Sequence, residues 1–405
     1  MDWARPGEIA ARTARPAGVG LAATLGGGLL YLPSGVAQGA GPQAPLAYLL
    51  AGGGVACLAV AFAVVAAGPF TERAPVYGAV SRVWGSRRLG ALAAWSALAG
   101  YVALLALLAE WLGRLAPLPA TTGAYVSGTL GAPTGLAALS GVGVPAPLVG
   151  DALAATVCLL ALGVHLAGTR RAALAAAVPA WGVVLGVGAL LVAAFFPAIG
   201  EFVPGNFDPL YPTSGLRRAP LGSLVGGVGV ALFAFLGVES AAYAVAVERS
   251  AKATGGAEGG GRDDAASAPV VAASVAGALV SLTALVALGV IDWTRLTLAD
   301  IPAADAIAAY LPVDPVALTV VVSTAAGLAA LVAFGVPAAR TLTGFAELYP
   351  PLERGPAEPP VVALVVVYGA AAALAVADLV APALYVAVPG LALSYLAVAT
   401  TAAAM

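Results

Sequence analysis

The residues from Gly18 to Pro33, GVGLAATLGGGLLYLP, are apolar enough to lie in a lipid bilayer, yet Gly26, Gly27 and Gly28 stand in their middle. Glycine inside a helix costs about 1 kcal/mol relative to alanine, so three in succession predict a local unwinding. Backbone that leaves the helix at membrane depth must face protein or a water-filled cavity. A second interrupted segment is indicated at Phe233–Ala241, FAFLGVESA. Two such breaks are typical of transporters whose exposed helix ends bind the substrate.

The composition of the whole chain indicates an integral membrane protein. Of its 405 residues, 61% are apolar and 9% are charged, and the mean hydropathy is +0.98. A soluble chain of this length carries far more charge. The sequence has no basic patch for nucleic acid, no phosphate-binding loop, and no metal-ligand or catalytic motif. We therefore expect no enzyme activity, no cofactor, no metal and no nucleic-acid partner.

Windows of about 20 apolar residues predict ten membrane-spanning helices, so the expected fold class is all-α. The predicted spans are 18–38, 44–67, 89–113, 148–167, 173–196, 221–245, 269–291, 315–338, 360–377 and 380–400. With the N-terminus in the cytoplasm, 14 of the 18 Lys and Arg residues fall on the cytoplasmic side. This asymmetry predicts a multi-pass protein of the cell (plasma) membrane in that orientation.

The spans divide into two halves of five. Residues 1–17 form a cytoplasmic N-terminal segment, 18–196 the first five-helix repeat, 197–220 an outer loop and 221–400 the second repeat. The second repeat contains a glycine-rich cytoplasmic linker, 249–267, and an uncharged stretch at 115–147 is expected to be an outer loop. The two interrupted segments are then the first helix of each half, as an inverted repeat requires.

Interrupted helices offer two kinds of binding group at membrane depth. A helix N-terminus presents free N–H groups that suit a carboxylate, and a helix C-terminus presents free carbonyls that suit an ammonium group. The arrangement fits a zwitterionic amino acid. Glu239 is the acid placed well inside a span, where a charge costs a few kcal/mol, so it is either a proton carrier or a neutral hydrogen-bonding group. Glu248 is expected to pair with Arg249 or Lys252 at the cytoplasmic mouth.

The segments TLGGGLLYLPSG and ALFAFLGVESAAYAVAVE resemble the first and sixth helices of permeases of the amino acid–polyamine–organocation superfamily. The resemblance implies the five-plus-five inverted repeat of the leucine-transporter fold, with broken helices 1 and 6, and amino acid transport by alternating access. It places the substrate carboxylate at Thr24, Leu25, Gly26, Gly27 and Gly28. The substrate amine and side chain would lie against Phe233, Phe235, Leu236 and Gly237, with Phe235 as a gate.

The chain also departs from that family. Gly27 replaces the serine of its glycine–serine–glycine motif, and the helix-five lysine of some proton-coupled members has no counterpart. We expect a secondary active transporter of neutral, apolar amino acids, coupled to protons or working by exchange. A sodium-coupled or exchange carrier of another small amine or a nucleobase stays open, with Ser323 and Thr324 as sodium ligands, and so does a non-transporting sensor or accessory subunit. The expected partners are the substrate and membrane lipid, and the sequence leaves monomer and homodimer open.

Overall fold

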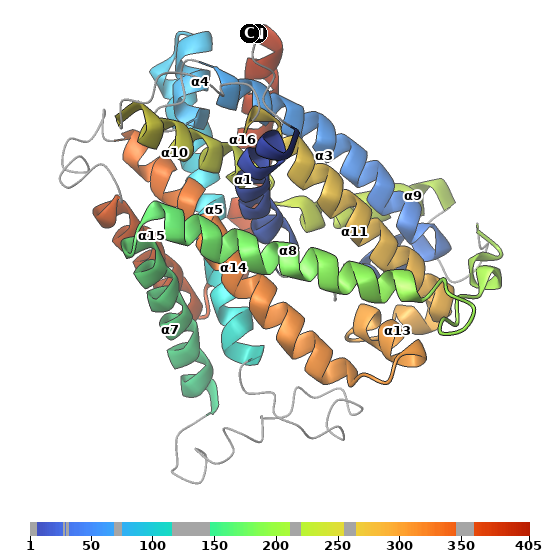
Figure 1. Ribbon diagram of the computed structural model, residues 1–405. Coiled ribbons are helices and arrows are strands. Elements are labelled where there is room, and N and C mark those ends of the chain that lie inside the picture. Colours follow the sequence, from blue (N-terminus) through green and yellow to red (C-terminus); the bar gives the residue numbers. More distant parts are fainter. Residues whose placement is uncertain are drawn as a thin grey trace.

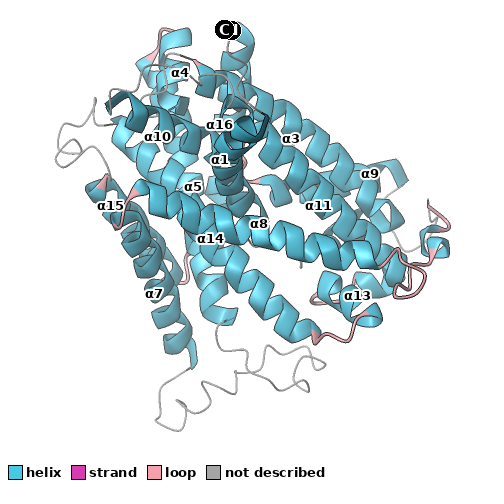
Figure 2. Cartoon of the chain, viewed as in Figure 1, coloured by secondary structure: helices cyan, strands magenta, loops and turns pink. Residues whose placement is uncertain are grey.

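The computed structural model describes residues 6–26, 29, 32–68, 75–115, 146–210, 220–254, 265–345 and 360–405. This part of the chain contains helices and no strand (Figure 2). Eight of its helical stretches are long and apolar enough to cross a membrane. The predicted class, an all-α multi-pass membrane protein, is thereby confirmed.

The described part of the chain consists of helices with 3-10 turns between some of them. In chain order they are α1 (Pro6–Leu25), α2 (Leu32–Ala40), α3 (Ala44–Ala67), α4 (Pro75–Val83), α5 (Arg87–Leu115), α7 (Ala146–Leu166), α8 (Thr169–Ala193), α9 (Pro220–Ala231), α10 (Ser240–Thr254), α11 (Ala268–Val290), α12 (Trp293–Leu296), α13 (Pro302–Tyr310), α14 (Pro315–Gly344), α15 (Val361–Val376) and α16 (Val380–Ala404). The 3-10 turns are η1 (Gly41–Gln43), η3 (Pro204–Phe207), η4 (Leu232–Phe235) and η5 (Ala265–Ser267).

The helix bounds differ from the predicted spans mainly at the ends. α1 begins at Pro6, so residues 6–17 of the predicted N-terminal segment are helical and continuous with the first predicted span. Its early turns are built of alanine, arginine and glutamate, which are good helix formers outside the bilayer as well as inside it. α10 likewise continues to Thr254, into the predicted linker. Most of that linker (255–264) and most of the 115–147 stretch lie outside the described residues.

Local chemistry explains where several helices begin. Asp314 precedes α14, and its side chain accepts hydrogen bonds from the backbone N–H groups of Val316 and Ala317 at 2.8 and 3.2 Å. Proline occupies the next position, 315, where a missing N–H costs nothing. Gly168 has a φ of 117° and lets the chain pass from α7 directly into α8.

α1 lies at the centre of the bundle, where it packs against α8, α10, α11 and α14 (Figure 1). α3 packs along α11, and α5 packs along both α14 and α16. α7 and α15 lie side by side at one edge, and α9 and α13 lie on the opposite side of the bundle (Figure 1). The interrupted segments at the end of α1 and between α9 and α10 are therefore surrounded by helices from both halves of the chain.

Candidate functional site

The first interruption separates α1 from α2. Thr24 and Leu25 are buried, and the Thr24 hydroxyl donates to the carbonyl oxygen of Gly20 at 2.7 Å, so it already has a partner inside α1. Gly26 follows in a turn, and a Cβ atom there would lie 2.1 Å from the Cβ atom of Ala330 in α14. Glycine is therefore required where α1 ends. Gly27 and Gly28, two of the predicted carboxylate-binding residues, lie outside the described residues.

The second interruption separates η4 from α10. After Phe235 the backbone of Leu236 is extended, with a ψ of 130°, and Gly237 has a φ of 102°. A residue with a side chain would be strained at that φ by about 1–2 kcal/mol. A Cβ atom at Gly237 would also lie 2.6 Å from the Cβ atom of Ala23 and 2.6 Å from the Phe334 ring. The dihedral angle and the close approach to α1 both demand glycine.

The two interruptions thus meet inside the bundle. Gly237 touches Ala23, the residue before Thr24, and one turn away a Cβ atom at Gly20 would lie 2.8 Å from the Cβ atom of Ala241 in α10. The structure therefore brings together the part of the predicted site formed by Thr24, Leu25, Gly26 and Gly237.

The two predicted aromatic residues lie in different surroundings. Phe233 is half exposed. Phe235 is buried, and its ring lies against the backbone of Gly52 in α3 and Gly277 in α11. The Phe235 ring therefore packs between two helices, and in this structure it contributes to the packing of the bundle. Leu236 packs against the core in a partly buried position next to Gly237.

Glu239 lies between Gly237 and the first residue of α10, and its side chain is fully buried. Its Oε2 atom accepts a hydrogen bond from the hydroxyl of Tyr395 in α16 at 2.8 Å. Its Oε1 atom has no hydrogen-bond partner among the described residues. The start of α10 supplies partial positive charge, which offsets part of the cost of a carboxylate at this depth. Glu239 can hold a proton or release one without a fixed counter-charge beside it in the described chain.

An aromatic cluster surrounds this carboxyl group. The rings of Tyr101 and Tyr243 meet edge to face at 6.4 Å between centroids, and those of Phe62 and Tyr395 do so at 5.7 Å. The Tyr243 hydroxyl is 3.1 Å from the Thr341 hydroxyl. These tyrosines were not among the predicted site residues. A tyrosine in the interior of a predicted span is the signal that could have found them, since its hydroxyl needs a partner in the membrane.

The predicted sodium ligands lie about two helical turns along α14 from the residue that faces Gly26. Ser323 and Thr324 are in α14, and Ser323 is seven residues before Ala330, the residue that faces Gly26. At 1.5 Å per residue this is about 10 Å along the helix. Ala330 itself has no side-chain oxygen, so α14 offers no such ligand beside the end of α1.

Two polar side chains near the ends of α7 and α10 have specific partners. Glu248 pairs with Arg15 of α1 at 3.0 Å, a partner that the sequence did not indicate. His165 is buried, its Nε2 atom is 2.9 Å from the Val332 carbonyl oxygen, and its ring centroid lies 5.8 Å from that of Tyr368. Glu110 forms an ion pair with Arg114, which lies one helical turn further along α5.

Neither a scan against models of known protein families nor a search of curated proteins finds a match for this chain. The chemistry of the site is therefore argued from its own residues. They provide two helix interruptions in contact and one buried carboxyl group held by a tyrosine from a third helix.

Proposed function

We propose that this chain is a secondary active transporter of small neutral amino acids, which works by alternating access around its two interrupted helices. The observation that carries the proposal is the contact between Gly237 and the end of α1, with the buried Glu239 beside it. Interruptions at membrane depth cost backbone hydrogen bonds, and a protein keeps them where a substrate uses the freed groups.

The packing of the helices supports a five-plus-five arrangement. If α1 with α2, α3, α5, α7 and α8 form one half, their counterparts are α9 with α10, α11, α14, α15 and α16. The contact between α5 and α16 in the structure then corresponds to the contact between α14 and α8. In the same way, the contact between α5 and α7 corresponds to the contact between α14 and α15. The pairs α3 with α11, α5 with α14, and α7 with α15 map onto themselves. Such a pattern is expected when two similar halves pack about a pseudo-two-fold axis.

The charge of the site supports a neutral substrate. The ends of the interrupted helices carry partial charges of both signs, which match the carboxylate and ammonium groups of one zwitterion. Glu239 is the acid beside the interruptions, and the described part of the site contains no lysine or arginine to hold an acidic side chain. An apolar substrate side chain is the complement of the buried alanine, leucine and phenylalanine residues around it.

Glu239 is the proposed proton-coupling residue. Uptake of a proton would leave its hydrogen bond to Tyr395 possible and remove a buried charge at the start of α10, while release would restore that charge. Because Glu239 lies immediately before α10 and Tyr395 lies on α16, the protonation state of Glu239 affects how the start of α10 is held against α16. The sodium-coupled alternative gains no support from Ser323, given its distance from the end of α1.

The experiment is transport in proteoliposomes that contain this protein alone. We expect labelled neutral amino acids to accumulate when an inward proton gradient is imposed, and Glu239→Gln to abolish this pH dependence while the protein stays folded. Gln keeps an acceptor for Tyr395 and cannot ionise. Glu110→Gln, which alters a carboxylate in an ion pair far along α5, is the matched control and should keep the pH dependence.

Other outcomes would contradict parts of the proposal. Unchanged pH dependence in Glu239→Gln would reject the proton-coupling role and leave the transport proposal standing. Flux that needs unlabelled substrate inside the vesicles would identify an exchanger. Substrate binding without flux in any condition would reject transport and favour a sensor.

A further inference from the structure

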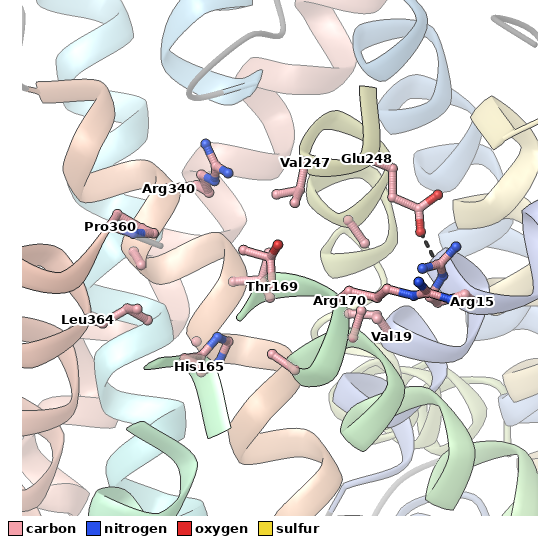
Figure 3. A pocket seen from close by; sticks show the side chains of 16 residues that line it. Arg15, Val19, His165, Thr169, Arg170, Val247, Glu248, Arg340, Pro360 and Leu364 are labelled. Atoms are coloured by element: carbon pink, nitrogen blue, oxygen red, sulfur yellow. Dashed lines mark ion pairs between the residues drawn. The ribbon is translucent and has the colours of Figure 1, made fainter. Parts of the chain in front are cut away.

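A hollow region lies in the part of the bundle that collects arginine side chains. It is a partly open cavity of about 400 Å³, lined by residues of α1, α7, α8, α10, α14 and α15 (Figure 3). Under the proposed topology this is the cytoplasmic end. The volume is in the range of small-molecule sites. It lies apart from the interruptions, since its lining residue Val19 stands seven residues before Gly26 in α1.

The charged side chains of the lining are predominantly positive. They are Arg15, Arg170 and Arg340, against one carboxylate, Glu248. Glu248 pairs with Arg15 of α1 at 3.0 Å. Arg170 reaches the cavity from another helix, α8 (Figure 3). Guanidinium groups from three helices at one cavity favour a ligand with several oxygen acceptors and negative charge.

The start of α8 adds backbone donors to the same cavity. Gly168 is the N-cap of this helix and has no side chain to cap it. The first helical hydrogen bond is donated by Ala172 to the Gly168 carbonyl, so the preceding N–H groups have no partner within the helix. Thr169, Arg170 and Ala173 of this first turn line the cavity, and the end of α8 carries partial positive charge.

His165 provides a polar group at the α7 side of the cavity. The Val332 carbonyl 2.9 Å from Nε2 accepts a hydrogen bond, which places the proton on Nε2 and leaves Nδ1 as an acceptor in the neutral ring. A Cβ atom at Gly335 would lie 2.6 Å from Nε2, so α14 packs tightly against this ring and holds it in place. As a lining residue, His165 thus offers a hydrogen-bond acceptor, which suits a ligand that bears both charge and an O–H group.

We propose that this cavity binds a phosphate group. A hydrogen phosphate has the negative charge for Arg15 and Arg170, oxygen atoms for the start of α8, and an O–H that can donate to Nδ1 of His165. A carboxylate has no such donor. The phosphate belongs to a soluble phosphate compound or to a lipid headgroup that enters from the bilayer. Binding there would connect α1 to α8, and the proposal does not depend on transport.

The test is the binding of labelled inorganic phosphate to the full-length protein in nanodiscs of zwitterionic lipid. We expect saturable binding that weakens about tenfold or more in Arg170→Gln, as the loss of a charge-assisted hydrogen bond predicts. Arg171→Gln is the matched control, because Arg171 is the adjacent arginine of α8 and is exposed outside the lining. Ala173→Leu, which fills part of the cavity without changing charge, should also weaken binding.

A second arm distinguishes the two sources. If the occupant is a lipid headgroup, nanodiscs with added phosphatidic acid should bind less free phosphate. The protein should also retain phosphatidic acid on purification, and Arg170→Gln should lose it. Unchanged phosphate binding in those discs would identify a soluble compound. Equal loss in the Arg170 and Arg171 variants, or no saturable binding of phosphate and no Arg170-dependent lipid retention, would overturn the proposal.

Discussion

At the scale of single residues, the hydrogen bond between Tyr395 and Glu239 joins the second interruption to the last helix of the chain. Glu239 is buried, Tyr395 is partly buried, and the bond is 2.8 Å long. If the Tyr395 hydroxyl is removed, water cannot easily take its place as a hydrogen-bond donor, because the Glu239 carboxyl group is buried. The pair is therefore expected to stabilise the fold as well as to hold Glu239 in place.

Tyr395→Phe tests that expectation. Removing the hydroxyl should lower the free energy of unfolding in detergent by about 1–3 kcal/mol, because the Glu239 carboxyl group stays buried without this partner. Tyr385→Phe in the same helix is the control, since Tyr385 is 84% exposed and should tolerate the change. Chemical denaturation of the two purified variants compares them, and equal stability would show that the bond contributes nothing to folding.

The sequence predicted Glu239 but could not predict its partner. A single acidic residue in an apolar span is visible because charge is rare there. Tyr395 is far away along the chain, and only the packing of α16 against α5 and α3 brings it near. For the same reason, the pairing of Arg15 with Glu248 was out of reach, because local spacing favours neighbours such as Arg249.

At the scale of helices, the interruption before α10 depends on one glycine. Gly237 combines a φ of 102° with close contact to Ala23 and Phe334. The glycine run in the first span predicted an interruption by composition. The GVES segment gave a weaker signal, because one glycine in a span is common and the positive φ is set by the packing around it.

Gly237→Ala should destabilise the protein by about 2 kcal/mol or more, from backbone strain and overpacking together. Gly229→Ala in α9 is the matched control, because a Cβ atom there meets nothing within 4 Å and alanine favours a helix by about 1 kcal/mol. Thermal stability of both variants in the same detergent measures the difference. A Gly237→Ala protein as stable as Gly229→Ala would mean that the interruption can relax.

At the scale of the whole molecule, the charge asymmetry of the sequence predicts the orientation of the protein in the membrane. The predicted orientation places Arg171, in the first turn of α8, on the cytoplasmic side of the membrane. It places Asp300, which follows α11, on the outer side. In intact cells, a membrane-impermeant maleimide should label Asp300→Cys and leave Arg171→Cys unlabelled until the membrane is opened. Cys57 and Cys158 are first replaced by alanine. The reverse labelling would invert the topology and place the arginine-lined cavity outside.

The positions of the spans were largely predictable, because hydropathy reports the cost of leaving the bilayer. α3, for example, covers the predicted span 44–67. The contacts between helices were not predictable, since alanine and glycine faces look alike in every span. α13 was missed as well, because a nine-residue helix outside the apolar spans leaves no hydropathy signal.

The position of the Phe235 ring has a consequence for sequence variation. A Cβ atom at Gly52 would lie 3.2 Å from this ring and one at Gly277 would lie 3.7 Å from it, so the three positions share one volume between α3, α11 and η4. A larger residue at position 52 is compatible with this packing only if position 235 becomes smaller. Chains that share this fold should therefore covary at these positions, with the size of one residue falling wherever the size of another rises.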